Sequence, residues 1–277
     1  MRVPRILMCP PDYYGIEYEI NPWMSRSRGA DRPLAVVQWE GLVKILRELG
    51  VQVELMKPQQ GLPDLVFTAN AGVVINNCFY SSQFRHEERA RESPVFDAWF
   101  TEHGFEVRHF PEGTFHEGAG DALFCGEALF AGYRIRSDIH GHQWLAKDAG
   151  IRVLPLELID PYYYHLDTCF CPIAPGLAIY FPEAFDDYGR KVLTTHVKHL
   201  IPVADPEAKR FGCNAVVVGN TVVTNTGCPK LAENLQKLGY QTRETPLDEF
   251  LKAGGSAKCL TIRLDGEEAA IWVKASA

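Results

Sequence analysis

The sequence lacks the cysteine patterns that hold small proteins together. Its eight cysteines are scattered over 277 residues, and none belongs to the paired C-x-x-C spacing of a zinc site. We therefore expect reduced thiols. A chain of this length, with 46% hydrophobic and 23% charged residues, can bury an ordinary apolar core and needs no disulfide to fold.

Long apolar runs are also missing. Two long stretches without charged residues, 67–84 and 214–229, are interrupted by Asn, Thr, Ser and Gly and make poor membrane spans. The first residues reach prolines and an aspartate before an apolar region of signal-peptide length can form. These features predict a cytoplasmic protein that does not associate with a membrane.

Basic residues are too few for a nucleic-acid-binding protein. The chain has 28 Lys and Arg against 35 Asp and Glu, a formal charge of -7 and a pI near 5.7. This is the wrong sign for binding a phosphate backbone, so we expect no nucleic-acid partner.

A pattern of helix followed by strand recurs five times. Five segments have amphipathic helical spacing, and four of them end in glycine, the residue that favours the left-handed conformation after a helix. A short extended segment follows each one. The predicted helices cover 31–50, 84–104, 137–150, 184–200 and 228–239, and the strands cover 51–56, 105–110, 151–156, 201–205 and 240–246.

An apolar, hairpin-like stretch follows each of these strands, at 65–82, 118–133, 166–182, 214–227 and 258–264. Near its start each stretch carries a polar residue or a cysteine, and the spacings between these are 51, 46, 47 and 45 residues. Five such repeats predict a closed ring of sheet modules, with helices outside and a central polar cleft, as one catalytic domain over 1–277. An ordinary α/β sheet with coincidental spacing is the alternative. The five residues are Asn70, Asp121, Asp167, Asn214 and Cys259.

Cys259 is the candidate nucleophile among the cysteines. It lies between the glycine-containing segment 253–258 and an apolar strand, a position that suits an exposed thiol. Neighbouring Lys258 or a histidine from elsewhere could favour the reactive thiolate. The alternative is that Cys259 is a small buried hydrophobic residue, as most cysteines are.

His165 and Asp167 are two residues apart in YYYHLDTCF, so an extended segment presents both side chains on one face. A histidine beside a carboxylate can carry protons to and from leaving groups. A structural, hydrogen-bonded histidine among tyrosines is the alternative.

Glu117 and Asp121 flank three small residues in FHEGAGDAL, where the backbone can turn tightly and approach a ligand. Two carboxylates in a cleft suit a guanidinium, which is planar and has several N–H donors. Two solvated acids around a simple turn remain the alternative. The segment lacks the spacing of a phosphate-binding loop.

Arg89 and Arg136 each follow a hairpin-like stretch and are candidates for binding a carboxylate, because guanidinium groups bind it in a bidentate manner. Solvated arginines on helices are the alternative. His140 and His142 have no obvious third partner for a metal, so we propose no metal site.

Five ordered motifs resemble those of the guanidino-group-modifying enzymes, the superfamily of arginine deiminases, dimethylarginine dimethylaminohydrolases and amidinotransferases. They are FTAN at 67–70, FHEGAGD at 115–121, GYRIRS at 132–137, HLD at 165–167 and GGSAKC at 254–259. This resemblance, which covers most of the chain, implies the pentein fold, a five-bladed α/β propeller with pseudo-fivefold repeats.

The resemblance also implies roles for the candidate residues. Cys259 would be the nucleophile and His165 the acid and base, and Glu117 with Asp167 would hold the guanidinium. Arg89 and Arg136 lie 19 residues after Asn70 and Glu117, similar to the positions from which arginine deiminases bind the substrate carboxylate. It further implies a small guanidino substrate and no metal or organic cofactor, and it leaves room for a homo-oligomer.

Asn70 departs from the superfamily pattern, in which deiminases and dimethylarginine hydrolases place an aspartate. An ionised aspartate only accepts hydrogen bonds, whereas asparagine both accepts and donates and could bind first a guanidinium and then a ureido group. With the segment 8–24, FTANAG is similar to bacterial arginine dihydrolases, which form ornithine, carbon dioxide and ammonia from arginine. Asp121 would orient the substrate or the carboxylates, and Asn21 would cover its amino-acid end.

Other functions remain open at this point. Within the superfamily, the alternatives are a dimethylarginine hydrolase, an arginine deiminase that forms citrulline, and an amidinotransferase. A ribosome-binding propeller, similar to archaeal initiation-factor relatives of the fold, is the non-enzymatic alternative. The presence of Cys259, His165 and Glu117 and the net acidity disfavour it.

Overall fold

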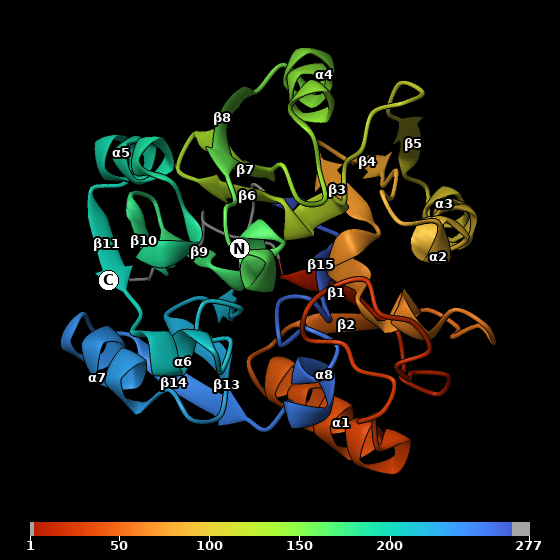
Figure 1. Ribbon diagram of the computed structural model, residues 1–277, viewed down its shortest axis with the longest axis horizontal. Helices are drawn as coiled ribbons and strands as arrows, with labels where there is room; N and C mark the ends of the chain where they lie inside the picture. Colours follow the sequence, from red (N-terminus) through yellow and green to blue (C-terminus); the bar gives the residue numbers. More distant parts are fainter. Residues whose placement is uncertain (1–2, 268–277) are drawn as a thin grey trace.

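The computed structural model describes residues 3–267, so the ends of the predicted domain, 1–2 and 268–277, lie outside the described residues. Residues 3–267 form five three-stranded sheets arranged in a ring (Figure 1). This confirms the closed ring of five sheet modules that the repeats predicted, and it is the five-bladed α/β propeller that the resemblance implied. Within the described part of the chain, no helix is both long and apolar enough to cross a bilayer.

Each blade has the same topology. Its inner strand pairs antiparallel with the middle strand, and the middle strand pairs parallel with the outer strand, which returns through a helix. In order from inner to outer strand, the blades are β3 Gly72–Ile75, β4 Cys78–Ser81 and β5 Glu106–His109; β6 Ala122–Cys125, β7 Ala128–Tyr133 and β8 Arg152–Glu157; β9 Phe170–Ala174, β10 Leu177–Tyr180 and β11 His199–Pro202; β12 Val216–Val218, β13 Thr221–Asn225 and β14 Gln241–Thr245; and β15 Ile262–Arg263, β1 Arg5–Met8 and β2 Gln52–Leu55.

The longer helices lie round the edge of the ring, where their polar faces meet solvent (Figure 1). Aspartates cap three of them by accepting backbone N–H groups, and glycines with positive φ follow four of the predicted helical segments, as expected. The helices are α1 Arg32–Glu48, α2 Glu87–Ala90, α3 Ser93–Glu102, α4 Ile139–Ala149, α5 Asp187–His196, α6 Asp205–Ala208, α7 Pro229–Lys237 and α8 Asp248–Leu251.

Two predicted helices have different bounds. The segment 84–104 is not one helix, because α3 starts afresh with Pro94 in its first turn, where proline needs no N–H partner. The break places Arg89, on the short α2, in the interior. The helix predicted to reach Leu200 ends at His196, because residues 199–202 pair with β10.

The fifth blade is closed by the two ends of the chain. We expected a hairpin within 258–264, but this stretch contributes only β15, whose antiparallel partner is β1 near the N-terminus. β1 also pairs parallel with β2, which completes the sheet. Closing the ring in this way ties both ends of the described chain to one blade.

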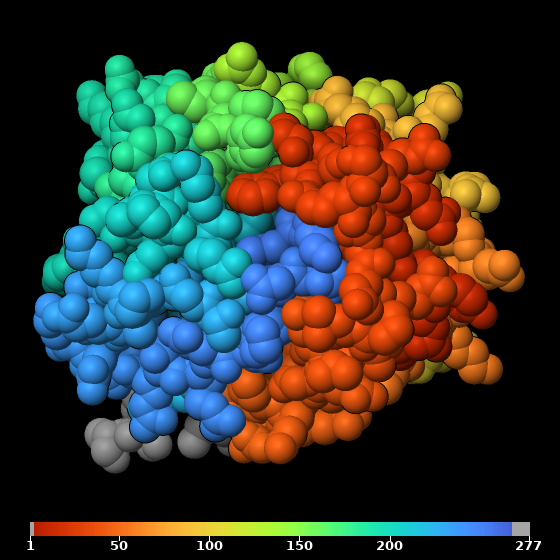
Figure 2. Space-filling view, turned by 60° about the horizontal axis from the view of Figure 1, so that its bottom comes forward, coloured from red at the N-terminus to blue at the C-terminus, as the bar shows by residue number. Residues whose placement is uncertain are grey.

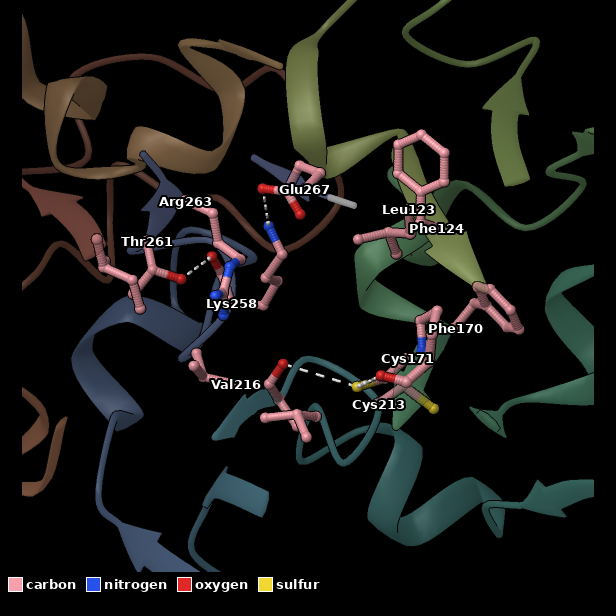
Figure 3. A pocket seen from close by; sticks show the side chains of 14 residues that line it. Leu123, Phe124, Phe170, Cys171, Cys213, Val216, Lys258, Thr261, Arg263 and Glu267 are labelled. Carbon is pink, nitrogen blue, oxygen red and sulfur yellow. Dashed lines mark hydrogen bonds and ion pairs between the residues drawn. The ribbon is translucent and has the colours of Figure 1, made fainter. Parts of the chain in front are cut away.

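The inner strands surround the propeller axis and leave an apolar pocket at one end of it. Side chains from β6, β9, β12 and β15 line this pocket, with Leu123, Phe124 and Phe170 on one side (Figure 3). The segments that precede the inner strands gather at the other end of the axis, and the candidate residues lie there.

Candidate active site

Cys259 lies in a turn that leads into β15, and it is buried rather than exposed as predicted, with 3% of its surface accessible. Its Sγ is 3.5 Å from Asp167 Oδ2 and 3.1 Å from Asn214 Nδ2. The turn is also bonded to the first blade, since the backbone N–H of Ala69 donates to the Cys259 carbonyl at 3.1 Å. The fifth blade thus delivers a thiol into the centre of the site.

The surroundings favour the protonated thiol. Burial raises the pKa of Cys259 well above its usual value, and the Asp167 carboxylate raises it further. The Lys258 ammonium does not lie against the sulfur, as we had considered, but points into the apolar pocket, 3.6 Å from Glu267 Oε1 (Figure 3). A thiolate here therefore needs a bound cation or a nearby hydrogen-bond donor.

His165 is buried and hydrogen-bonded to Glu117, with 2.8 Å between Nε2 and Glu117 Oε2. On its other side Nδ1 lies 3.4 Å from Asn70 Nδ2. Residues 166–168 form a 3₁₀ turn instead of the extended segment we predicted. His165 and Asp167 consequently face different partners, Glu117 and Cys259, within one site.

Glu117 is a buried carboxylate held by a guanidinium. Arg136 Nη1 donates to Glu117 Oε2 at 2.9 Å, and the backbone N–H of Arg85 donates to the other oxygen at 3.1 Å. Burial by itself would raise the pKa of Glu117, but Arg136 and His165 outweigh it, and the net pKa lies well below its usual value. Glu117 is thus ionised, and the alternative of two solvated acids is wrong.

Asp121 lies behind the site. Its Oδ2 accepts from Ser137 Oγ at 2.6 Å and its Oδ1 from the backbone N–H of Leu166 at 3.0 Å. Burial raises the pKa of Asp121 to about 6. The carboxylate therefore holds the backbone next to His165.

Asn70 lies between Arg89 on one side and His165 and Glu117 on the other. Its Oδ1 accepts from Arg89 Nη1 at 2.8 Å, so its Nδ2 is turned toward His165 Nδ1 and the Glu117 carbonyl, 3.3 Å away. The backbone of Gly120 packs closely against this amide, because a Cβ added at Gly120 would lie 2.4 Å from Asn70 Nδ2. This explains the small residues between Glu117 and Asp121.

Arg89 and Arg136 are buried and line the same cavity. Arg89 makes a two-point ion pair with Glu92, at 2.9 and 2.7 Å. Arg136 stacks on the Tyr164 ring at 4.7 Å from its centroid and donates to the Ile20 carbonyl at 3.0 Å. Neither is a solvated surface arginine.

An N-terminal segment covers the site. Figure 2 shows this part of the chain, in red, against the blue C-terminal part. Asn21 Nδ2 donates to the Ala253 carbonyl at 3.0 Å, while its Oδ1 accepts from the backbone N–H groups of Trp23 and Met24. Asn21 is thus part of the wall of the cavity, together with Ile20 and Met24 from the same segment.

The structure therefore brings Cys259, His165, Glu117, Asp167, Asn70, Arg89, Arg136 and Asn21 together, and places Asp121 behind them. We missed two residues. Asp64 is buried with an unpaired Oδ1 in the cavity wall, and burial raises its pKa; the sequence carried no signal for it. Asn214 was visible through its spacing, but we assigned it no role.

The comparisons with known proteins agree with this geometry. The family profile described as "N,N dimethylarginine dimethylhydrolase, eukaryotic" matches residues 18–265. The chain is also 37% identical to the N(G),N(G)-dimethylarginine dimethylaminohydrolase of Mycobacterium tuberculosis, over 95% of this chain and 86% of that protein. The chain belongs to the dimethylarginine dimethylaminohydrolase family.

Two cyanobacterial proteins are similar to this chain at higher identity. The bifunctional arginine dihydrolase/ornithine cyclodeaminase AgrE of Nostoc sp. is 48% identical over 94% of this chain, which spans 38% of the length of that protein. The N-terminal domain of ArgZ, an arginine dihydrolase from the ornithine-ammonia cycle in cyanobacteria, has been solved bound to substrate. It superimposes with a TM-score of 0.91 at 46% identity, over 94% of this chain and 98% of that domain.

Proposed function

We propose that this protein is an arginine dihydrolase, which converts L-arginine to ornithine, carbon dioxide and two molecules of ammonia. The observation that carries the proposal is the amide of Asn70 beside the candidate acid and base: its Oδ1 accepts from Arg89 Nη1, and its Nδ2 lies 3.4 Å from His165 Nδ1. An aspartate at this position would offer no donor. The similarity to the arginine dihydrolase domain supports the same conclusion.

The substrate would bind through both of its charged ends. Its guanidinium would lie between Asp167 and Glu117, both buried, where carboxylates can hold a planar cation with its carbon facing Cys259 Sγ. Arg89 and Arg136 supply positive charge for the α-carboxylate, and the unpaired Oδ1 of Asp64 suits the α-ammonium group. Asn21 and its segment would close the cavity over this end.

The first half-reaction releases one ammonia. The guanidinium introduces positive charge beside Cys259, which favours loss of the thiol proton to His165. The sulfur forms a bond to the guanidinium carbon, and His165 passes the proton to the departing nitrogen, which leaves as ammonia. A positively charged thiouronium remains on Cys259.

Water completes the first round. Its oxygen bonds to the thiouronium carbon as the S–C bond breaks; one proton goes to His165 and the other to the sulfur. The product is citrulline, with Cys259 restored as a thiol. Glu117 stabilises His165 when it carries the extra proton, since its carboxylate is 2.8 Å from Nε2.

The second round needs a donor for the ureido group, and Asn70 Nδ2, 3.4 Å from His165 Nδ1, would provide it. Cys259 attacks the ureido carbon, a second ammonia leaves with the thiol proton, and a neutral thiocarbamate forms. Water hydrolyses it to a carbamate, which releases carbon dioxide and ornithine.

A dimethylarginine dimethylaminohydrolase is the second candidate. The 37% identity to the Mycobacterium tuberculosis protein, over most of both chains, favours it. The chemistry would stop after the first round, with dimethylamine as the leaving group. Citrulline would then be the end product.

Product analysis of the purified protein with L-arginine tests the proposal. Ornithine, citrulline, urea and ammonia are measured together, and we expect ornithine with two ammonia per arginine and no urea. Citrulline with one ammonia would mean a deiminase, and transfer to an added amine would mean an amidinotransferase. With dimethylarginine, dimethylamine release faster than arginine consumption would favour the second candidate. Any of these three results would overturn the dihydrolase.

A further inference from the structure

Asn214 is held by the backbone on both sides of its amide. It is completely buried, its Oδ1 accepts from the Cys259 N–H at 3.1 Å, and its Nδ2 donates to the Asp167 carbonyl at 3.0 Å. A reversed amide would set donor against donor and acceptor against acceptor, so these two bonds fix its orientation. The second N–H of Nδ2 is then directed at Cys259 Sγ, 3.1 Å away.

The Asn214 amide donates to a sulfur whose other surroundings disfavour the thiolate. The other polar side chain against the sulfur is Asp167, whose carboxylate oxygens lie at 3.5 and 3.7 Å and disfavour negative charge there. Among the side chains of residues 3–267, Asn214 is the one that donates an N–H hydrogen bond to Sγ. Hydrogen bonds to charged acceptors are roughly twice as strong as neutral ones, so this bond strengthens as the thiol ionises.

The fold also explains why this residue is in place. Asn214 precedes inner strand β12 just as Asn70, Asp121 and Asp167 precede β3, β6 and β9. The carbonyl of Asn214 accepts from the Lys258 N–H at 3.4 Å, so the turn that carries Cys259 is bonded to Asn214 at three points. The fourth blade positions the sulfur delivered by the fifth.

We propose that Asn214 is a catalytic residue, whose Nδ2–H stabilises the thiolate of Cys259 before and during attack on the guanidinium carbon. This rests on the proposed role of Cys259 as nucleophile. No proton leaves Asn214; the thiol proton goes to His165 as described above, and the amide supplies only a hydrogen bond to the developing charge.

Alkylation of Cys259 tests the proposal without requiring turnover. The full chain is treated with iodoacetamide between pH 6 and 10, and labelling of the Cys259 peptide is followed by mass spectrometry. Asn214→Ala should label about tenfold more slowly at pH 8, with the difference shrinking as the pH rises and the thiol ionises without help. Asn214→Asp, which replaces the donor by an acceptor, should be slower still.

Kinetics provide the second readout. Both variants should lower kcat with L-arginine by about 10- to 100-fold. Binding of L-arginine to Cys259→Ser, measured by calorimetry, should change by less than about threefold when Asn214→Ala is added, because the amide contacts the sulfur and not the substrate. If wild-type protein does not hydrolyse arginine, the proposed function fails, while the alkylation experiment still decides the role of Asn214.

Asn225 offers a matched control. It is a buried asparagine that also bridges two backbone groups, donating to the Arg210 carbonyl at 3.1 Å and accepting from the Leu247 N–H at 2.9 Å, with no contact to the sulfur. Asn225→Ala should lower Tm without changing the pH dependence of alkylation. Equal alkylation profiles for Asn214→Ala and wild type, or the same loss in Asn225→Ala, would overturn the proposal. If Asn214→Ala does not fold, the alkylation rate of the nearly isosteric Asn214→Asp decides between the two outcomes.

Discussion

The two ends of the propeller axis are built from the same five blades but have opposite chemistry. One end is lined by Asn70, Arg89, Arg136 and Cys259, while the other is walled by Leu123, Phe124 and Phe170 and their neighbours. The candidate nucleophile and the two buried arginines therefore share the polar end.

The difference follows from where side chains lie in each blade. The polar end is formed by short 3₁₀ turns before the inner strands, whose side chains and free backbone groups can point at a ligand. The apolar end is lined by side chains of the inner strands themselves, such as Leu123 and Phe124 of β6 and Phe170 of β9. Lys258 and Cys259, adjacent in sequence, face opposite ends.

Replacing the cysteine at each end by serine should give the largest difference in activity. Cys259→Ser is expected to reduce arginine consumption by more than about 10,000-fold, because a hydroxyl is not ionised here and cannot replace the thiolate. Cys213→Ser, at the apolar end, is the control and should retain activity. Steady-state assays and Tm of both variants check this, and near-normal turnover by Cys259→Ser would refute the nucleophile.

Asp167→Asn should separate activity from stability. Burial raises the pKa of Asp167 to about 7 from its ordinary value of 3.8, so the folded protein holds this proton more tightly than the unfolded chain. Stability should therefore fall as pH rises through this range, and less so in the variant. We expect a Tm advantage for Asp167→Asn that grows from pH 5 to pH 8, with activity lower by about 100-fold or more. Thermal melts across pH check it; an advantage that shrinks with pH would contradict it.

Asn70→Asp tests whether the polar end is specialised for two rounds of hydrolysis. The variant keeps the acceptor for Arg89 Nη1 but loses the donor toward His165. We expect the ratio of citrulline to ornithine to rise by about tenfold or more, because the ureido group loses its donor in the second round. Chromatographic product analysis measures the ratio. Unchanged ornithine output would refute the role assigned to Asn70.

Substitution of Lys258, which faces the apolar end, should have the smallest effect on activity. Its ammonium pairs with Glu267 and lowers the pKa of Asp167 through its charge. In the double variant Lys258→Met with Glu267→Gln, we expect kcat/KM to fall by less than about tenfold at neutral pH. The lower pH limit of activity should move upward, because loss of the Lys258 charge raises the pKa of Asp167 more than loss of the Glu267 charge lowers it. A pH–rate profile without this movement would show that the two ends are electrostatically independent.

The repeats, the helix ends and most candidate residues could be predicted from the sequence, because they depend on local patterns. Glycines with positive φ end the predicted helical segments at Gly50, Gly104, Gly150 and Gly239. Asp64 could not be found this way, since nothing near it distinguishes a cavity-lining carboxylate from any other acid. Asn214 marked its repeat but not its contact with Cys259, because that contact joins residues 45 positions apart.

By itself, the amino-acid sequence determined five repeating units and the polar residue that opens each of them, because hydrophobic periodicity and turn residues act over short distances. Tertiary structure alone decided that β1 closes the blade begun by β15, that Cys259 is buried, and that Lys258 turns away from it. These features arise from packing between distant segments, in which the available space and partners, and not local propensity, determine where a side chain lies.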